Sequence, residues 1–176
     1  MPPRGFEEVV LPHLDAAFNY ARWLTKSDAD AEDVVQDAAV RALRFFSSLR
    51  NDDARAWLLT IVRNTWYARF SKIGVADRHA VLDDMKDERP DEQLDPEALV
   101  IQRQSTERVQ RAIGELPVDF REVIILRELE GLSYKEIAAV IGAPIGTVMS
   151  RLARARERLL AVLEPASTPG GAGELS

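Results

Sequence analysis

The stretch GLSYKEIAAVIGAPIGTVMSRLARARERL, residues 131–159, decides the fold of the C-terminal half of this chain. Its apolar residues recur at three- and four-residue spacing on both sides of a short break, which predicts two helices joined by a tight turn. Ser133 and Glu136 have the spacing of a capping box that starts the first helix. Gly142 can adopt the left-handed conformation that ends it, and Pro144 suits the first turn of the second helix.

The second of these helices has two different faces. Its predicted inner stripe is Val148, Leu152, Ala155 and Leu159. The polar and basic residues expected to face outward are Thr147, Ser150, Arg151, Arg154 and Arg158. Hydroxyls and arginines near the start of the second helix, together with the small Ala138 in the first, are typical of a DNA-binding helix-turn-helix. An ordinary helical hairpin with a solvated arginine face is the alternative, and the turn spacing favours the helix-turn-helix.

A second candidate nucleic-acid surface is RAWLLTIVRNTWYARFSK, residues 55–72, which has four bases and no acid. Arginines that follow phosphates, interleaved with rings that stack on unpaired bases, suit single-stranded or melting DNA. The alternative is that some of these rings are core residues, because they recur near helical spacing. The residues proposed to contact DNA here are Arg55, Arg63, Asn64, Trp66 and Tyr67.

Helical spacing dominates the rest of the chain, and sustained two-residue alternation is absent. We therefore predict an all-α protein of two small helical domains joined by an acidic flexible linker. The predicted helices are 6–26, 29–46 and 53–71 in the first domain, and 97–114, 118–129, 133–141 and 145–163 in the second. The predicted domain bounds are 6–72, a linker at 73–99, 100–163, and a disordered tail at 164–176.

The acidic pI of about 5.1 is a property of the linker. Residues 1–72 and residues 100–176 each carry ten acids and ten bases, whereas residues 73–99 carry nine acids and three bases. The linker thus holds the whole net charge of −6. An acidic chain is therefore no argument against DNA binding by the two flanking domains.

Composition also excludes several classes of site. The chain has no cysteine, so disulfides and thiolate metal sites are ruled out. The two histidines, His13 and His79, have no spacing that forms a catalytic site, and no Gly-rich phosphate loop follows a strand. We therefore expect no enzyme activity and no cofactor. We also expect no metal, because the acids of 28–37 lack the glycine and the bidentate Glu of a calcium loop. Neither a membrane span nor a signal peptide is indicated, which suggests a cytoplasmic protein.

The helix predicted at 29–46 begins with acids that would interact favourably with the helix dipole. Asp33, Gln36 and Asp37 also fall on one exposed face of that helix. We interpret this face as a candidate surface for docking another protein.

In order and spacing, these motifs resemble a bacterial RNA polymerase sigma factor. DAEDVVQDAAVRAL, then RAWLLTIVRNTWYARF, an acidic linker, and LPVDFREVIILRELEGLSYKEIAAVIGAPIGTVMSRLARARERL resemble the small extracytoplasmic-function (ECF) class, which has only sigma regions 2 and 4. The resemblance covers about 9–72 and 100–163. It implies a subunit that binds core RNA polymerase and directs promoter recognition, DNA melting and transcription initiation.

The resemblance also implies roles for particular residues. Glu32, Asp33, Gln36 and Asp37 fall on the helix that holds the clamp of the polymerase β′ subunit, and region 4 would contact the β flap. Residues 47–54 and Asn64 fall where the −10 element is melted and a flipped base is captured. Ser150, Arg151 and Arg154 fall on the helix that reads the −35 element. The implied partners are core polymerase, promoter DNA and an anti-sigma factor, whose existence the sequence leaves open.

Three alternatives remain at this point. A free-standing helix-turn-helix regulator would need the C-terminal domain only, and it leaves residues 55–72 unexplained. An enzyme lacks any candidate site. A sigma mimic that sequesters an anti-sigma factor has no need of the arginines or of Asn64.

Overall fold

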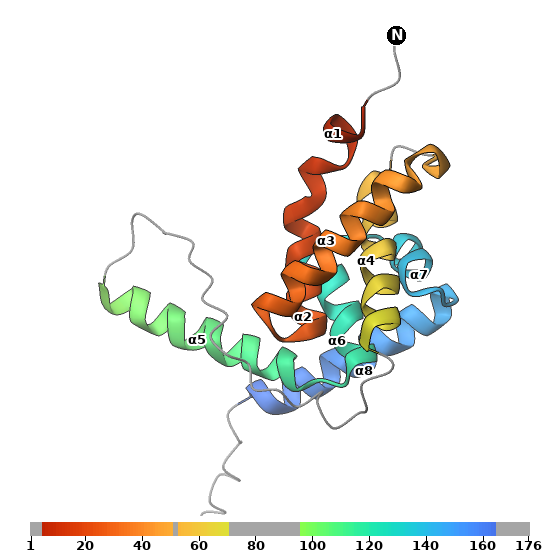
Figure 1. Cartoon of the computed structure of the whole chain (residues 1–176). Helices are drawn as coiled ribbons and strands as arrows, with labels where there is room; N and C mark the ends of the chain where they lie inside the picture. Colours follow the sequence, from red (N-terminus) through yellow and green to blue (C-terminus); the bar gives the residue numbers. More distant parts are fainter. Residues whose placement is uncertain (1–4, 51–52, 71–95, 165–176) are drawn as a thin grey trace, which may run out of the picture.

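The computed structural model describes residues 5–50, 53–70 and 96–164. Within these ranges the regular structure is entirely helical, which confirms the all-α prediction. Figure 1 shows the helices in chain order, with α2, α3 and α4 packed together and α6, α7 and α8 behind and beside them. Most of the acidic linker predicted over 73–99, and all but the first residue of the tail predicted over 164–176, lie outside the described residues.

The helix predicted over 6–26 is divided into three pieces. These are α1, Phe6–Val9, the 3₁₀ turn η1, Leu11–His13, and α2, Leu14–Thr25. The interruption coincides with Pro12 in the first positions of η1. Proline has no backbone N–H and clashes with the preceding helical turn, so a continuous α-helix through this position is unfavourable.

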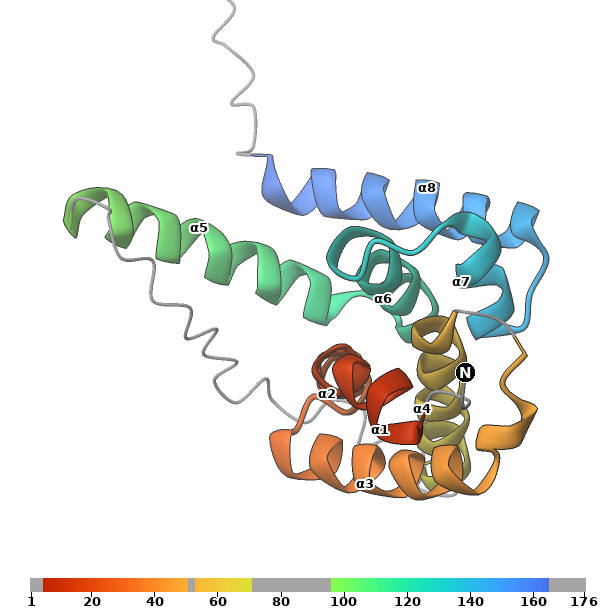
Figure 2. The ribbon, with the colours of Figure 1, turned by 90° about the horizontal axis from the view of Figure 1, so that it is seen from above.

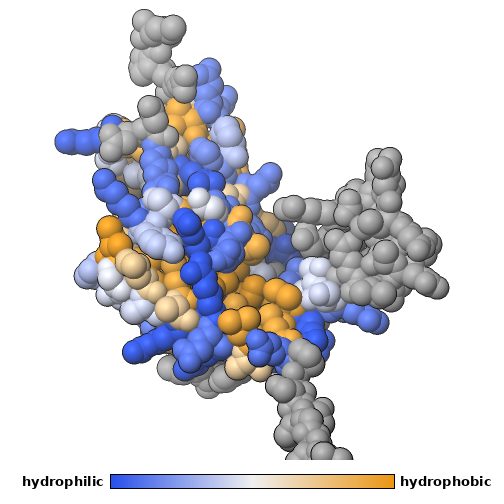
Figure 3. Space-filling model, turned by 180° about the vertical axis from the view of Figure 1, so that it is seen from behind, coloured by the Kyte–Doolittle hydropathy of each residue, from blue (hydrophilic) through white to orange (hydrophobic). Residues whose placement is uncertain are grey.

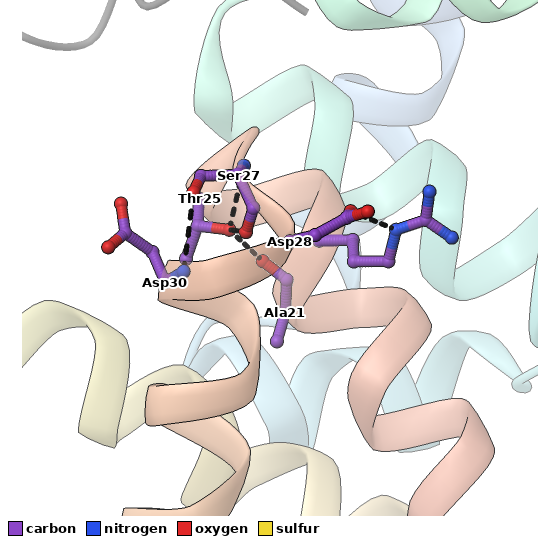
Figure 4. A network of polar contacts seen from close by, with 6 residues as sticks. Ala21, Thr25, Ser27, Asp28 and Asp30 are labelled. Carbon is purple, nitrogen blue, oxygen red and sulfur yellow. Dashed lines mark hydrogen bonds and ion pairs between the residues drawn. The ribbon is translucent and has the colours of Figure 1, made fainter. Parts of the chain in front are cut away.

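Local hydrogen bonds fix the turn between α2 and α3, Asp28–Arg44. Lys26 ends α2 in the left-handed conformation at φ 57°, and Ser27 then caps α3 by accepting from the Asp30 N–H at 3.2 Å. The Thr25 hydroxyl lies 2.8 Å from the Ala21 carbonyl oxygen, to which it can donate a hydrogen bond (Figure 4). Ser27, the residue immediately before α3, thereby satisfies one of the N–H groups that the start of a helix leaves unpaired.

A 3₁₀ turn η2, Phe46–Ser48, follows α3 and precedes α4, Ala54–Phe70. Small residues of α3 face α2 and α4, which lets the three helices approach closely. The buried residues of α3 are Ala31, Val34, Ala38 and Ala42, and those of α4 include Leu58, Leu59, Val62 and Trp66. These three helices form the first module.

The second module begins with α5, Pro96–Glu115, whose first half extends away from the other helices in Figure 2. It continues with α6, Val118–Ile124, and a five-residue π-helical turn η4, Ile125–Leu129. The sequence predicted one regular helix over this last pair. The module ends with α7, Tyr134–Ile141, and α8, Ile145–Leu163, and α8 packs against both α6 and α7.

The two modules are in contact. Helix α4 packs against α7, and α2 packs against α6. One continuous cluster of buried apolar side chains runs from α2, α3 and α4 into α6, α7 and α8. Figure 3 shows the opposite side of the molecule, where hydrophobic surface gathers between hydrophilic side chains. The exposed large apolar residues of α8 are Ile145, Met149, Leu160 and Val162.

Candidate nucleic-acid interface

Helices α7 and α8 have the geometry of a helix-turn-helix. Their axes differ by 100°, and three residues separate them. This angle lies within the range of about 90–120° that is usual for such pairs. The capping box is formed: the Glu136 N–H donates to Ser133, and the Glu136 carboxylate accepts from the Ser133 N–H. Gly142 ends α7 at φ 66°, a conformation that residues with a side chain rarely adopt. Pro144 is the residue immediately before α8.

The inner face of α8 is the predicted one, with Val148, Leu152 and Ala155 buried and Leu159 partly buried. The polar residues of the opposite side reach solvent to different extents. Ser150, Arg154 and Arg158 are exposed, whereas Thr147 and Arg151 are partly buried. The Ser150 hydroxyl lies 3.1 Å from the Thr147 carbonyl oxygen, which keeps it close to the helix surface.

Two other arginine contacts join α8 to its module. Arg156 donates to the Glu128 carboxylate at 2.8 Å, and this hydrogen bond raises the pKa of Arg156. The Arg158 guanidinium lies 4.8 Å from the centre of the Phe120 ring, within the range of a cation–π contact. Arg154, by contrast, projects from the exposed side of the helix.

Helix α4 carries the five residues proposed to contact DNA in the first module, and their environments differ. Asn64 is exposed and Arg55 is partly buried. Trp66 is only 5% exposed and belongs to the core, with its ring 4.6 Å from that of Tyr67. Its burial follows from helical spacing with Val62 and Leu59. In this conformation the Trp66 ring is not available for stacking on a base.

Arg63, the last of the five, binds a carboxylate of the other module. Its Nε donates to Glu122 at 2.8 Å, and its Nη2 donates to the second carboxylate oxygen at 3.1 Å. The Tyr67 ring lies 4.5 Å from the same guanidinium. Burial alone would lower the pKa of Arg63, but the hydrogen bonds and charge of Glu122 outweigh burial and raise it.

Sequence reasoning missed Glu122 and its second partner, Tyr20. The Glu122 side chain is 0% exposed and accepts a hydrogen bond from the Tyr20 hydroxyl at 3.1 Å. Burial, followed by the charge of Glu122, raises the pKa of Tyr20 well above its ordinary value, so Tyr20 stays a donor. The only sign of this pairing in the sequence was a Glu inside a mostly apolar run, VDFREVIIL at residues 118–126. Its two partners are 102 and 59 residues away in the chain.

The acidic face of α3 is exposed. Glu32, Asp33, Gln36 and Asp37 all reach solvent on this helix. Arg69 of α4 lies beside two of them, 2.8 Å from Asp37 and 3.7 Å from Asp33. All three of these side chains are about half exposed, so such ion pairs contribute little to stability and leave the carboxylates accessible.

Two acids also face each other where α4 meets α7. The Asp53 carboxylate accepts from the Ala56 N–H at the start of α4, and the Glu136 carboxylate lies close to it. Burial and then the contact with Glu136 raise the pKa of Asp53. The pKa of Glu136 is lowered, chiefly by the Ser133 N–H of its own capping box. Like charges therefore meet at one edge of the contact between the modules.

No cluster of three or more metal-ligating side chains occurs in the part of the chain that the structure describes. Over the same residues no single helix is long and apolar enough to cross a membrane. The pair α7 and α8 reaches such length and composition only jointly, with the 100° bend between its helices.

Both modules match families of known proteins. Residues 9–74 match the family model for sigma-70 region 2, and residues 106–159 match that for sigma-70 region 4. The ECF RNA polymerase sigma-E factor of Escherichia coli K12 is 38% identical over 143 residues, which cover 77% of this chain and 75% of that protein. SigE, an ECF sigma factor of Mycolicibacterium smegmatis, is 32% identical over 155 residues. These cover 88% of this chain but only 60% of that longer relative.

A solved structure is similar over most of the chain. It is the sigma factor RpoE of Bartonella quintana in complex with the anti-sigma factor NepR, at a TM-score of 0.72 and 32% identity. The match covers 90% of this chain and 96% of that one. A second, CnrH in complex with the cytosolic domain of CnrY, has a TM-score of 0.62 at 29% identity and covers 90% of this chain and 86% of that one.

Proposed function

The chain belongs to the ECF RNA polymerase sigma factors of the sigma-70 family, and we propose from this premise that it binds core RNA polymerase and directs it to a promoter. The single observation that supports the proposal is the presence in one chain of two candidate nucleic-acid surfaces, α4 and the α7–α8 helix-turn-helix. Region 2 is the module of α2, α3 and α4, and region 4 is the module of α5 to α8.

Region 4 would read the −35 element through α8. Because the first turns of a helix entering the major groove face base edges, Ser150 and Arg154 are proposed to contact bases. Thr147 and Arg151 lie on the flank of the same helix and would position it on the backbone. Arg158, one turn beyond Arg154, would lie nearer to phosphates, and its contact with Phe120 holds it at the side of the helix.

Region 2 would bind the −10 element and the polymerase on different helices. Asn64 is proposed to hydrogen-bond a base edge after strand separation, because its amide is both donor and acceptor and is exposed. Arg55, Arg63 and Tyr67 would follow the phosphates and stack beside the melted strand. The acidic face of α3, with Asp33 and Asp37, would dock on the β′ clamp, and region 4 on the β flap.

A second class of partner is an anti-sigma factor. The solved relative from Bartonella quintana is bound to one, and this chain adopts an arrangement similar to that bound form over 90% of its length.

The proposed function is tested by transcription in vitro. Core polymerase is incubated with fragmented genomic DNA, with and without the purified chain, and the transcripts are sequenced. New start sites that share a two-part upstream element support the proposal. A transcript population identical to that of core polymerase alone contradicts it.

A DNA-binding experiment distinguishes this function from the alternative, a free-standing helix-turn-helix regulator. A regulator would bind the selected sequences without polymerase, whereas a sigma factor needs the polymerase to place both of its surfaces.

A further inference from the structure

The helix proposed to read the −35 element also exposes large apolar side chains to water. Met149 of α8 is 53% exposed, and Ile145 at the start of the same helix is 45% exposed. The core of the module instead takes Val148 and Leu152, from the inner side of α8. Single exposed apolar residues are common on protein surfaces, so exposure alone assigns no role to Met149. Its position along the helix is more informative.

Two neighbouring rows of exposed side chains run along the first three turns of α8. Residues four apart lie one above the other on a helix. Ile145, Met149 and Ala153 form one row, which is apolar, and Ser150 and Arg154 form the next row, which is polar. In Figure 2, α6 and α7 lie on the inner side of α8, which follows one edge of the molecule. A ligand that binds the polar row from outside therefore also covers the apolar row.

The charge around the apolar row favours DNA as that ligand. Residues 145–156 of α8 include three arginines and no acid. The first acid, Glu157, takes the next place in the apolar row after Ala153, so the row ends there. A basic surface attracts the phosphates of DNA. Charge complementarity therefore favours DNA over an apolar surface of another protein as the occupant of this face.

The major groove of DNA presents one apolar group by which a base pair is recognised, the C5-methyl group of thymine. The other recognition groups in this groove are hydrogen-bond donors and acceptors, which an apolar side chain can only remove from water. Methionine is unbranched, flexible and polarizable, so it can adapt to a small apolar group. Ala153, one turn beyond Met149, is small and leaves the longer side chain room to lie along the groove.

We propose that Met149 contacts the C5-methyl group of a thymine in the −35 element and thereby selects thymine at one position. Ser150 and Arg154 make the polar base contacts beside it. The inference rests on the proposed function, and it adds a preference for one base that the hydrogen bonds of Ser150 and Arg154 do not supply.

The test removes the methyl group alone. A promoter obtained from the transcript sequencing is synthesised with each thymine of the −35 element, on either strand, replaced in turn by deoxyuridine, which keeps every hydrogen-bonding group. Holoenzyme affinity for each DNA is measured for the parent and for Met149→Ala. At one position the parent is expected to lose about threefold to tenfold in affinity, because one methyl group leaves an apolar contact. Met149→Ala should bind the thymine and deoxyuridine forms of that position equally.

Leu160→Ala is the matched control. It removes another large apolar side chain, 58% exposed, from a later part of the same helix. The ratio of affinities for thymine and deoxyuridine cancels any effect of a variant that is the same on both DNAs. Leu160→Ala should therefore keep the ratio of the parent, even where its contact with polymerase changes. Circular dichroism checks that both variants keep the helix content of the parent.

Two results would overturn the proposal while leaving the proposed function intact. One is equal affinity of the parent for thymine and deoxyuridine at every position of the −35 element. The other is a ratio that persists unchanged in Met149→Ala, since a different residue would then contact the methyl group. Holoenzyme that binds the promoter no better than unrelated DNA would contradict the proposed function, and this inference with it.

Discussion

The Arg63 guanidinium binds both carboxylate oxygens of Glu122, at 2.8 and 3.1 Å, although 59 residues separate the two in the chain. This pair joins the helix proposed to contact the −10 element to the module proposed to read the −35 element. Arg63 cannot bind both oxygens of Glu122 and a DNA phosphate in the same way at once.

The acidic face of α3 predicts a docking variant. Asp37→Arg should weaken binding to core polymerase on the order of tenfold or more, because it reverses a charge on the proposed docking face and repels Arg69. Affinity is measured by titrating labelled chain with core polymerase. Asp15→Arg changes another exposed acid, on α2, and is the control that should bind as the parent does. Equal affinities for both variants, with unchanged circular dichroism, would remove the docking role from this face.

Asn64 predicts a defect in melting rather than in initial binding. Asn64→Ala should reduce open-complex formation more than promoter capture, since a base edge becomes accessible only after the strands separate. Permanganate reactivity of thymines in the −10 region reports melting, and a mobility-shift assay reports capture. The interpretation fails if the mutant and parent complexes react equally with permanganate.

Arg154 and Arg158 predict contrasting effects on the −35 element. A specific contact to a base contributes about 1–3 kcal/mol of discrimination, whereas a phosphate contact adds affinity without choice of sequence. Arg154→Ala should therefore reduce discrimination between matched and mismatched −35 sequences by about tenfold or more. Arg158→Ala should weaken all sequences nearly equally and lower the salt dependence, with some loss from its contact with Phe120.

Holoenzyme binding across −35 variants at two salt concentrations distinguishes the two arginines. A uniform loss over all sequences in Arg154→Ala would identify Arg154 as a phosphate contact and place the reading face elsewhere on α8.

The opposed acids predict a pH dependence of the contact between α4 and α7. The pKa of Asp53 is raised in the folded chain by burial and by Glu136, and the Ala56 N–H and the nearby Arg55 offset this rise only in part. Its stabilising contribution is therefore present below the ordinary Asp pKa and is lost as pH rises through the raised value. The lowered pKa of Glu136 comes chiefly from Ser133 in its own module, so separation of the regions changes it less.

The free energy of unfolding of the parent, measured in urea relative to that of Asp53→Asn, should accordingly increase as pH falls through the raised pKa of Asp53. Asp53→Asn keeps a good helix cap and removes the titrating group, so it should stabilise the contact between α4 and α7 at neutral pH and remove the part of the pH dependence that Asp53 contributes. A pH profile that is the same in the parent and in Asp53→Asn would contradict the assignment to Asp53.

Local features of the fold were predictable from the sequence because they depend on neighbours along the chain. Ser133 and Glu136 lie three residues apart, and Gly142 follows one helical run, so the capping box and the left-handed turn appear as predicted. Pro12 lies inside an apolar periodicity that predicted one helix, and the periodicity alone did not show the break.

The contact between the regions was not predictable in the same way. Trp66 has the spacing of both a core residue and a stacking residue, and only the packing of α4 shows its burial. Glu122 lies within a buried run of α6, and its partners Tyr20 and Arg63 come from two helices of another module. Pairings across such separations depend on how the modules pack, which composition and periodicity do not specify.

The most direct test of the account is a footprint of the parent chain on a promoter obtained from the transcript sequencing, with and without core polymerase. With polymerase, we predict protection of both the −35 and the −10 elements on the same DNA molecule, together with reactive thymines in the −10 region. Without polymerase, at the same chain concentration, we predict protection of neither. Equal protection of the −35 element by the chain alone would contradict the account and identify a free-standing regulator.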